Sequence, residues 1–309
     1  MTSPAQVHPA PLLEVTDLAV QLPTGRDSHV DAVRAVSLTV GRGERVGIVG
    51  ESGSGKSVTG RAIAGLLPTN PRVKVRGSIR FHGEELVGAN QRAWHEIRSR
   101  RVGMIFQDPL TFLNPTMRIG RQVRESLAAG KSRGAHVDAE VLRFLTLAGL
   151  SNAAEVAQRF PHELSGGMRQ RVLIAIAIAK TPEIIIADEP TTALDATVQQ
   201  LVLKTLDETV ADLGTSLVLI SHDIAVVANM TDRIYVMYGG RIVETGPTQE
   251  VLARPQHPYT QALLRSVLSL VDEDVELYSI PPAFRDWLRT EGEALATVGT
   301  ASTEHEEAH

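Results

Sequence analysis

The chain contains no cysteine among its 309 residues. This absence excludes disulfide bonds, cysteine-ligated zinc and iron–sulfur clusters, and it fits a reducing compartment. The sequence also has no excess of positive charge, since its formal net charge is −5. That balance disfavours a general nucleic-acid-binding protein. Hydrophobic and charged contents of 43% and 22% are ordinary for a folded protein.

Long apolar runs are also missing. The most apolar stretch, residues 172–179, is followed by Lys180 and Pro182 and falls far short of the roughly 20 residues that cross a bilayer. Residues 1–11 contain three prolines and no basic start before an apolar core. They are therefore predicted to be a disordered lead-in and not a secretion signal. Any role at a membrane is expected to be peripheral.

A glycine-rich loop lies between a predicted buried strand at 45–49 and a predicted helix at 57–67. It matches the phosphate-binding pattern G-x-x-x-x-G-K-[ST] at every position. Its backbone N–H groups and the following helix end suit anionic phosphates, Lys56 would reach the β- and γ-phosphates, and the Ser57 hydroxyl would bind Mg²⁺. The strand and helix around it disfavour the alternative, a glycine-rich turn without a ligand. The predicted phosphate loop consists of Gly50, Glu51, Ser52, Gly53, Ser54, Gly55, Lys56 and Ser57.

A pair of carboxylates follows the apolar run at 184–187. Two acids at the end of a buried strand are costly unless a bound charge offsets them, and a Mg²⁺–nucleotide does so. Asp188 is predicted to hold the metal and Glu189 to act as general base on the attacking water. A solvated turn after a core strand is the alternative.

Two further polar residues follow apolar runs. His222 comes after the predicted strand at 216–220, and Gln107 comes after residues 104–106. Parallel strands deliver their carboxyl ends to one edge of a sheet, where ligands bind. His222 is therefore a candidate for the γ-phosphate, although a lone histidine is more often structural. Gln107 is a candidate for contact with Mg²⁺ or water, a weak signal when taken alone.

Strands and helices alternate along the chain, which predicts a parallel sheet flanked by helices. The nucleotide-binding domain is expected to span residues 12–250, with a mostly helical subdomain inserted at about 92–180. Residues 251–309 are expected to form a short extension that ends in a solvated acidic tail.

A second glycine-rich loop, Leu-Ser-Gly-Gly-Met at 164–168, precedes another predicted helix. Together with the phosphate loop, the carboxylate pair and the histidine, in this order, it resembles the nucleotide-binding subunit of ATP-binding cassette (ABC) transporters. The resemblance covers roughly residues 12–270. It implies an α/β fold of the P-loop NTPase type: a RecA-like core, an N-terminal antiparallel β subdomain, an α-helical subdomain and a C-terminal extension. ATP and Mg²⁺ are the implied cofactors.

The resemblance assigns roles to the second loop. Ser165, Gly166 and Gly167 would contact the γ-phosphate of ATP held by an opposite subunit. The segment Ala193-Leu194-Asp195 matches the D-loop at the dimer interface, and Gln107 matches the Q-loop that couples the site to membrane subunits. The chain is therefore expected to be an ATPase that completes its sites only by pairing.

Several segments narrow the resemblance to the oligopeptide/dipeptide (and nickel) importer branch. They are residues 106–111, 113–115 and 161–163, together with His257-Pro258-Tyr259-Thr260. Met168 favours an unlike ATPase partner over a second copy of this chain. The branch implies two transmembrane permease subunits, an extracytoplasmic solute-binding protein, no nucleic acid, and a place at the cytoplasmic face of the membrane.

The chain departs from the family pattern at the position expected to contact adenine. No aromatic residue lies before Lys56 to stack on adenine, and Leu22 occupies the expected position. The transported substrate stays open, with peptides as the default and nickel or another small solute as the alternative. A soluble ABC ATPase acting on DNA or ribosomes fits less well, because the insertion lacks sustained heptads. The importer-type segments also argue against an exporter.

Overall fold

The computed structural model describes residues 10–25, 28–68, 70, 72–127, 135–192 and 194–268. Most of the predicted lead-in, Ala193 of the predicted D-loop and the predicted acidic tail lie outside these ranges. In the described part of the chain, no helix combines the length and the apolar character needed to cross a membrane.

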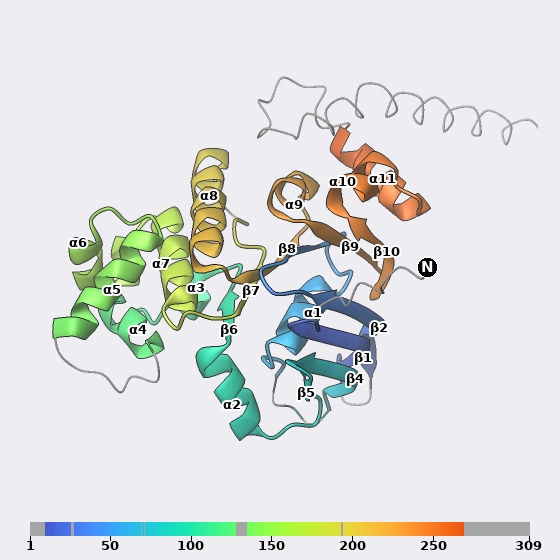
Figure 1. Cartoon of the computed structure of the whole chain (residues 1–309), viewed down its shortest axis with the longest axis horizontal. Coiled ribbons are helices and arrows are strands. Elements are labelled where there is room, and N and C mark those ends of the chain that lie inside the picture. Colours follow the sequence, from blue (N-terminus) through green and yellow to red (C-terminus); the bar gives the residue numbers. More distant parts are fainter. Residues whose placement is uncertain are drawn as a thin grey trace, which may run out of the picture.

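The larger of two sheets has six strands in the order β10-β9-β3-β8-β7-β6 (Figure 1). The strands from β9 to β6 are mutually parallel, as predicted, and β10 pairs antiparallel with β9. All five parallel strands therefore end at the same edge. The strands are β3 (Arg45–Val49), β6 (Val102–Ile105), β7 (Ile184–Asp188), β8 (Ser216–Ser221), β9 (Arg233–Tyr238) and β10 (Arg241–Pro247).

Both faces of this sheet are buried, which explains its unalternating apolar strands. Ile48 and Ile186 belong to one hydrophobic cluster, whereas Val49 and Ile185, on the opposite face, belong to another. The first cluster joins the large sheet to the smaller one, and the second joins it to the helical region. The site at the strand ends thus rests on a core packed from two sides.

The smaller sheet is antiparallel, in the order β2-β1-β4-β5. It corresponds to the predicted N-terminal β subdomain, and Phe81 and Val36 are among the residues that it contributes to the shared cluster. Its strands are β1 (Leu13–Pro23), β2 (His29–Val40), β4 (Lys74–Phe81) and β5 (Glu84–Glu85).

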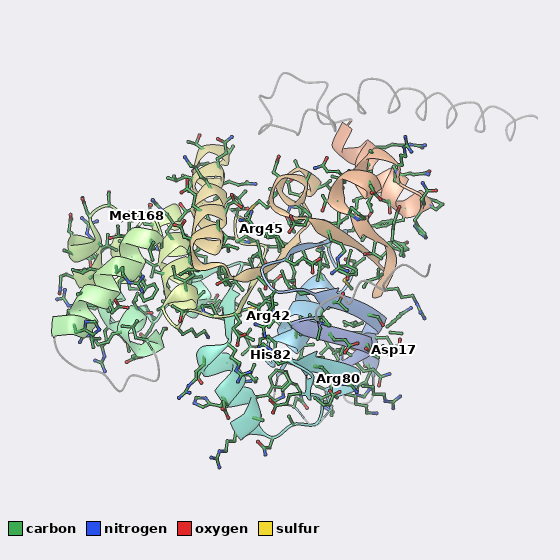
Figure 2. All side chains as sticks on the ribbon, in the orientation of Figure 1. Asp17, Arg42, Arg45, Arg80, His82 and Met168 are labelled. Carbon is green, nitrogen blue, oxygen red and sulfur yellow. The ribbon has the colours of Figure 1, made fainter. Side chains whose placement is uncertain are left out.

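A charged cluster around Glu183 also links the two sheets. Arg42, in the turn after β2, lies 3.4 Å from the Glu183 carboxylate, and His82 Nε2, after β4, lies 2.6 Å from it. Figure 2 labels Arg42 and His82 close to each other near the middle of the view. Because Arg42 donates to His82 Nδ1, the proton of a neutral His82 lies on Nε2.

Helices surround the large sheet, and one group of them forms a separate lobe. Figure 1 shows α4, α5, α6 and α7 together on the side away from the small sheet. The helices near the sheets are α1 (Lys56–Ile63), α2 (Gln91–Arg100), α8 (Ala196–Leu213), α9 (Ile224–Met230), α10 (Thr248–Ala253) and α11 (Pro258–Leu268). Those of the lobe are α3 (Pro109–Phe112), α4 (Ile119–Ser126), α5 (Ala135–Leu147), α6 (Ala153–Gln158), the 3-10 turn η2 (Pro161–Glu163) and α7 (Gly166–Ile178).

The segment at about 92–180, predicted to be mostly helical, also contains one strand. It contains β6, which pairs with β7 at the edge of the large sheet. A strand of only four residues gives little periodicity, which is why the sequence pattern predicts no strand here. The lobe of helices begins after this strand, at α3.

Helix α1 ends earlier than predicted. The expected end was residue 67, before Pro68, but the helix stops at Ile63. Gly65 has φ +64, its N–H donates to the Ala62 carbonyl, and the Leu66 N–H donates to the Arg61 carbonyl. This is a Schellman ending, in which a left-handed glycine terminates the helix before the proline is reached.

Candidate functional site

The phosphate loop connects β3 to α1, so its backbone opens toward the carboxyl edge of the large sheet. Glycine is required at two points. A Cβ on Gly50 would lie 2.1 Å from the Met237 carbonyl oxygen, and one on Gly55, whose φ is +99, would lie 2.3 Å from the Ala32 carbonyl oxygen. Gly53 is also left-handed, with φ +81. These positions give the loop a fixed curvature that other residues cannot adopt.

The remaining loop residues are placed as follows. Glu51 and Ser52 are exposed, whereas Ser54 is buried with no hydrogen-bond partner for its hydroxyl. The Ser54 N–H donates to the Glu51 carbonyl, which closes a turn inside the loop.

Lys56 is buried within its own loop. Its ammonium group donates to the Gly50 carbonyl at 2.7 Å and to the Glu51 carbonyl at 2.8 Å. Burial lowers the pKa of Lys56, and the nearby carboxylates of Glu189 and Asp188 oppose that effect. The lysine is thus oriented by backbone oxygens and lies in the electrostatic field of the carboxylate pair.

Ser57 and Asp188 bring α1 and β7 together. The Ser57 hydroxyl donates to Asp188 Oδ1 at 2.6 Å. Asp188 is fully buried, and its Oδ2 has no hydrogen bond, with Arg61 Nη2 at 3.6 Å. Burial raises the pKa of Asp188, while the bond from Ser57 and the charge of Arg61 work against the rise.

Glu189 contacts two other candidate residues, Gln107 and His222. Its Oε2 accepts hydrogen bonds from Gln107 Nε2 at 3.1 Å and Thr192 Oγ1 at 2.9 Å, and His222 Nδ1 lies 3.3 Å away. Its backbone has φ +48, a left-handed conformation that is uncommon for a side chain of this kind. The predicted Glu189, Gln107 and His222 therefore meet at one carboxylate, beside Asp188.

The second glycine loop caps α7. Ser165 is the N-cap and its hydroxyl accepts the Met168 N–H at 3.3 Å. A Cβ on Gly167 would lie 2.2 Å from Val198 Cγ1, so this glycine allows α7 to approach α8. For Gly166 the nearest such atom is Leu194 Cδ2 at 3.3 Å. Among the described residues, no hydrogen bond or ion pair joins this loop to residues 50–57.

Asp195 has a structural partner in this chain. It is the N-cap of α8, and its carboxylate accepts the Val198 N–H at 3.0 Å. The predicted D-loop thus lies beside the second glycine loop. Leu22, at the position where an aromatic residue was expected, is partly buried against the cluster shared by the two sheets.

Two residues at the site were not found from the sequence. Thr192, which bonds Glu189, has no motif of its own in the sequence argument. Tyr259, 208 residues after Glu51, accepts the Glu51 N–H at 2.9 Å. In the sequence, the motif around Tyr259 indicates only the importer branch. A contact between residues so far apart in the chain leaves no local sequence pattern.

Comparison with known families gives two matches. Residues 33–192 match the family described as ABC transporter, and residues 243–291 match the one described as oligopeptide/dipeptide transporter, C-terminal region.

Curated relatives agree. The oligopeptide transport ATP-binding protein OppD of Bacillus subtilis is 45% identical over 279 residues, which cover 87% of this chain and 76% of the relative. OppD of Salmonella typhimurium is 45% identical over 271 residues, covering 87% and 80%. The probable D,D-dipeptide transport ATP-binding protein DdpD of Escherichia coli is 46% identical over 256 residues, covering 82% and 78%.

Solved structures match the same architecture. The dimeric ATP-binding cassette MJ0796, in a post-hydrolysis state with ADP and phosphate, has a TM-score of 0.68 and 28% identity, covering 76% of this chain and 98% of its own. The two family matches, the complete phosphate loop and the carboxylate pair beside it point to the same family. The chain belongs to the ABC transporter family and is an ATP-hydrolysing cassette of its oligopeptide/dipeptide transporter branch.

Proposed function

We propose that the chain binds Mg²⁺–ATP on residues 50–57 and hydrolyses it to drive the import of peptides. The observation that carries the proposal is the meeting of α1, β7 and β8 at one sheet edge. There Ser57 bonds Asp188, and Glu189 contacts Gln107 and His222. Lysine, backbone N–H groups and the end of α1 supply the positive field that phosphates need.

The residues present fit a magnesium ion. Asp188 Oδ2 is buried without a hydrogen bond, next to the Ser57 hydroxyl. Hard oxygen donors with few carboxylates suit Mg²⁺, which keeps water and phosphate oxygens as its other ligands. Ser57, Gln107 and Asp188 would hold the ion, which supplies charge stabilisation to the phosphate oxygens when bound.

Glu189 is proposed as the general base. Its carboxylate would orient the attacking water and accept its proton, and Gln107 and Thr192 donate to the same oxygen and fix its direction. His222 lies within reach of that carboxylate from β8 and would donate a hydrogen bond to the γ-phosphate.

The second glycine loop is proposed to act on ATP bound by another subunit. Ser165, Gly166 and Gly167 cap a helix whose free N–H end suits a phosphate, and Asp195 stands next to them at the proposed dimer interface. Met168 supports an unlike ATPase as the partner. Figure 2 shows Met168 in the helical lobe, apart from Asp17 in the small sheet.

The complete importer is proposed to contain two transmembrane permease subunits and an extracytoplasmic solute-binding protein, with this chain at the cytoplasmic face of the membrane. Peptide transport is favoured over nickel because the curated relatives reported above are named for oligopeptides and dipeptides. A soluble ABC ATPase without a transport role is not favoured by these names.

The test is uptake by the full complex, with its solute-binding protein, in proteoliposomes. ATP-dependent uptake of peptides, and none of Ni²⁺, is expected. Uptake of Ni²⁺ without peptides would support the alternative cargo. Co-purification with ribosomes and no uptake of either would contradict the transport proposal.

A further inference from the structure

The segment His257-Pro258-Tyr259-Thr260 has no part in the function proposed above, yet it contacts the phosphate loop. Tyr259 lies in the first turn of α11, and its hydroxyl oxygen accepts the backbone N–H of Glu51 at 2.9 Å. Glu51 is an exposed residue, and this bond ties its backbone to the body of the protein. A residue of the C-terminal extension thus fixes the second residue of the loop.

The peptide group that Tyr259 contacts is also the one that Lys56 contacts. This group joins Gly50 to Glu51, and its carbonyl oxygen accepts from Lys56 Nζ at 2.7 Å. The tyrosine therefore binds the N–H end and the lysine the C=O end of a single peptide plane. From this geometry we infer that Tyr259 is a positioning residue, which sets the orientation of the phosphate loop and, through it, of Lys56.

Tyr259 is itself held by a chain of contacts that starts on β10. The two carboxylate oxygens of Glu244 accept the backbone N–H groups of Gln256, at 2.7 Å, and His257, at 3.1 Å. The imidazole Nδ1 of His257 accepts the Tyr259 N–H at 3.1 Å. Glu244 therefore orders the turn from which α11 presents the tyrosine.

The phenol ring is also constrained. It packs against the ring of Tyr238, with centroids 4.4 Å apart. Burial raises the pKa of Tyr259, so its hydroxyl stays neutral at physiological pH. A neutral hydroxyl accepts an N–H without adding charge beside the loop that receives phosphates. The extension is in this way a component of the nucleotide site and not an appendage to it.

The inference rests on the proposed function, because it places ATP on residues 50–57. Its test is the affinity of the purified full chain for ATP with Mg²⁺, measured by calorimetry. Tyr259→Phe keeps the ring and removes the hydroxyl, and it is expected to weaken binding by about 3–10-fold, the range of one net hydrogen bond. In the assembled transporter the KM for ATP should rise by the same factor while kcat changes less than about twofold.

Two further variants separate positioning from general destabilisation. Tyr235→Phe removes a hydroxyl that bonds Arg233 and Thr39 and no residue of the phosphate loop, and it should lower the melting temperature without changing ATP affinity. Glu244→Ala touches no loop residue, yet it should weaken ATP binding in the same direction as Tyr259→Phe, because it loosens the turn before α11.

Lys56→Ala distinguishes failure of this inference from failure of the proposed site. If Lys56→Ala abolishes ATP binding while Tyr259→Phe binds as tightly as the unmodified chain, Tyr259 has no positioning role and the site stands. An equal loss in Tyr235→Phe and Tyr259→Phe would also overturn the inference. If Lys56→Ala binds ATP normally, the placement of ATP is wrong and the inference fails with it.

Discussion

The Ser57 hydroxyl donates a hydrogen bond of 2.6 Å to Asp188 Oδ1, joining the first turn of α1 to the last residue of β7. The second oxygen of the same carboxylate is buried and receives no hydrogen bond. Only one of the two Asp188 carboxylate oxygens is therefore hydrogen-bonded. Arg61 Nη2, at 3.6 Å, is the cation nearest to that oxygen, and it makes no hydrogen bond to it. A buried carboxylate held this loosely is costly to the fold, and Mg²⁺–ATP would offset that cost by bringing a second cation to it.

Asp188→Asn is expected to separate stability from activity. Burial raises the pKa of Asp188, so the folded state favours the neutral acid, and its ionisation lowers stability as pH rises above the ordinary value of 3.8. Asparagine is neutral throughout. The variant should melt at the same or a higher temperature than the unmodified chain at pH 7 without nucleotide, while ATP hydrolysis by the assembled transporter falls about 100-fold or more.

Thermal denaturation between pH 5 and 8 and a phosphate-release assay measure the two effects of Asp188→Asn. A variant that is clearly less stable without nucleotide, or that hydrolyses ATP at the normal rate, would be inconsistent with the role given to Asp188.

Thr192→Val tests the orientation of Glu189. Thr192 donates to Glu189 Oε2 at 2.9 Å, and its loss leaves the carboxylate with less restraint. We expect kcat to fall about 3–10-fold with the KM for ATP unchanged, the size of one hydrogen bond. Thr209→Val is the matched control, since its hydroxyl bonds the Leu147 carbonyl in the helical region. A rise in KM without a change in kcat would assign Thr192 to binding instead.

Gly167→Ala tests the close approach of α7 and α8. The new methyl group would lie 2.2 Å from Val198 Cγ1, which forces the helices apart and should cost about 1–3 kcal/mol of the free energy of unfolding. Val198→Ala removes the opposing atoms, so the double variant should recover part of this loss. Urea denaturation of the single and double variants measures the coupling. Simple additivity of the two losses would show that the contact does not limit this position.

Lys180 gives a prediction about pH. Burial, aided by the charge of Arg98, lowers the pKa of Lys180 to about 8. An unfolded lysine titrates near 10.5, so between these values the unfolded chain holds a proton that the folded chain has released. The free energy of unfolding therefore gains from this residue as pH rises from about 8 to about 10.5.

Lys180→Met lacks this titration. The stability of the unmodified chain minus that of Lys180→Met should increase with pH across the same window, as urea denaturation at pH 7, 8, 9 and 10 would measure. Lys204→Met, at an exposed lysine of α8, is the control and should show no such trend. A difference that stays constant or shrinks with pH would contradict the assignment.

The sequence predicted the parts of the fold that carry strong local signals. β3, β7 and β8 are apolar without alternation because both faces of the sheet are covered. The phosphate loop follows β3, the carboxylate pair lies at the end of β7, and His222 follows β8. β6 was not predicted because four residues are too few to show a period. Gly65 ended α1 four residues before the expected position, since a left-handed glycine acts before a proline does.

Some residues of the candidate site could be predicted from sequence motifs, and others could not. Lys56, Asp188 and Glu189 stand in motifs whose spacing predicts their chemistry, and the structure brings them to one edge. The contacts of Thr192 with Glu189 and of Tyr259 with Glu51 are seen only in the folded structure. The contact between Tyr259 and Glu51 spans 208 residues and is made to a backbone N–H, which any residue at position 51 except proline would supply. A pattern of side chains therefore cannot predict this contact.

Glu189→Gln tests whether Glu189 is the base of an ATP site that a second subunit completes. The amide keeps the shape of the side chain but accepts no proton at neutral pH. The measurement is ATP turnover together with ATP-dependent association of the ATPase subunits, in the complex with the partner ATPase. If Glu189 is the base, the variant should bind ATP with normal affinity, lose turnover and form a dimer that stays closed with ATP bound. Normal turnover by Glu189→Gln would contradict it.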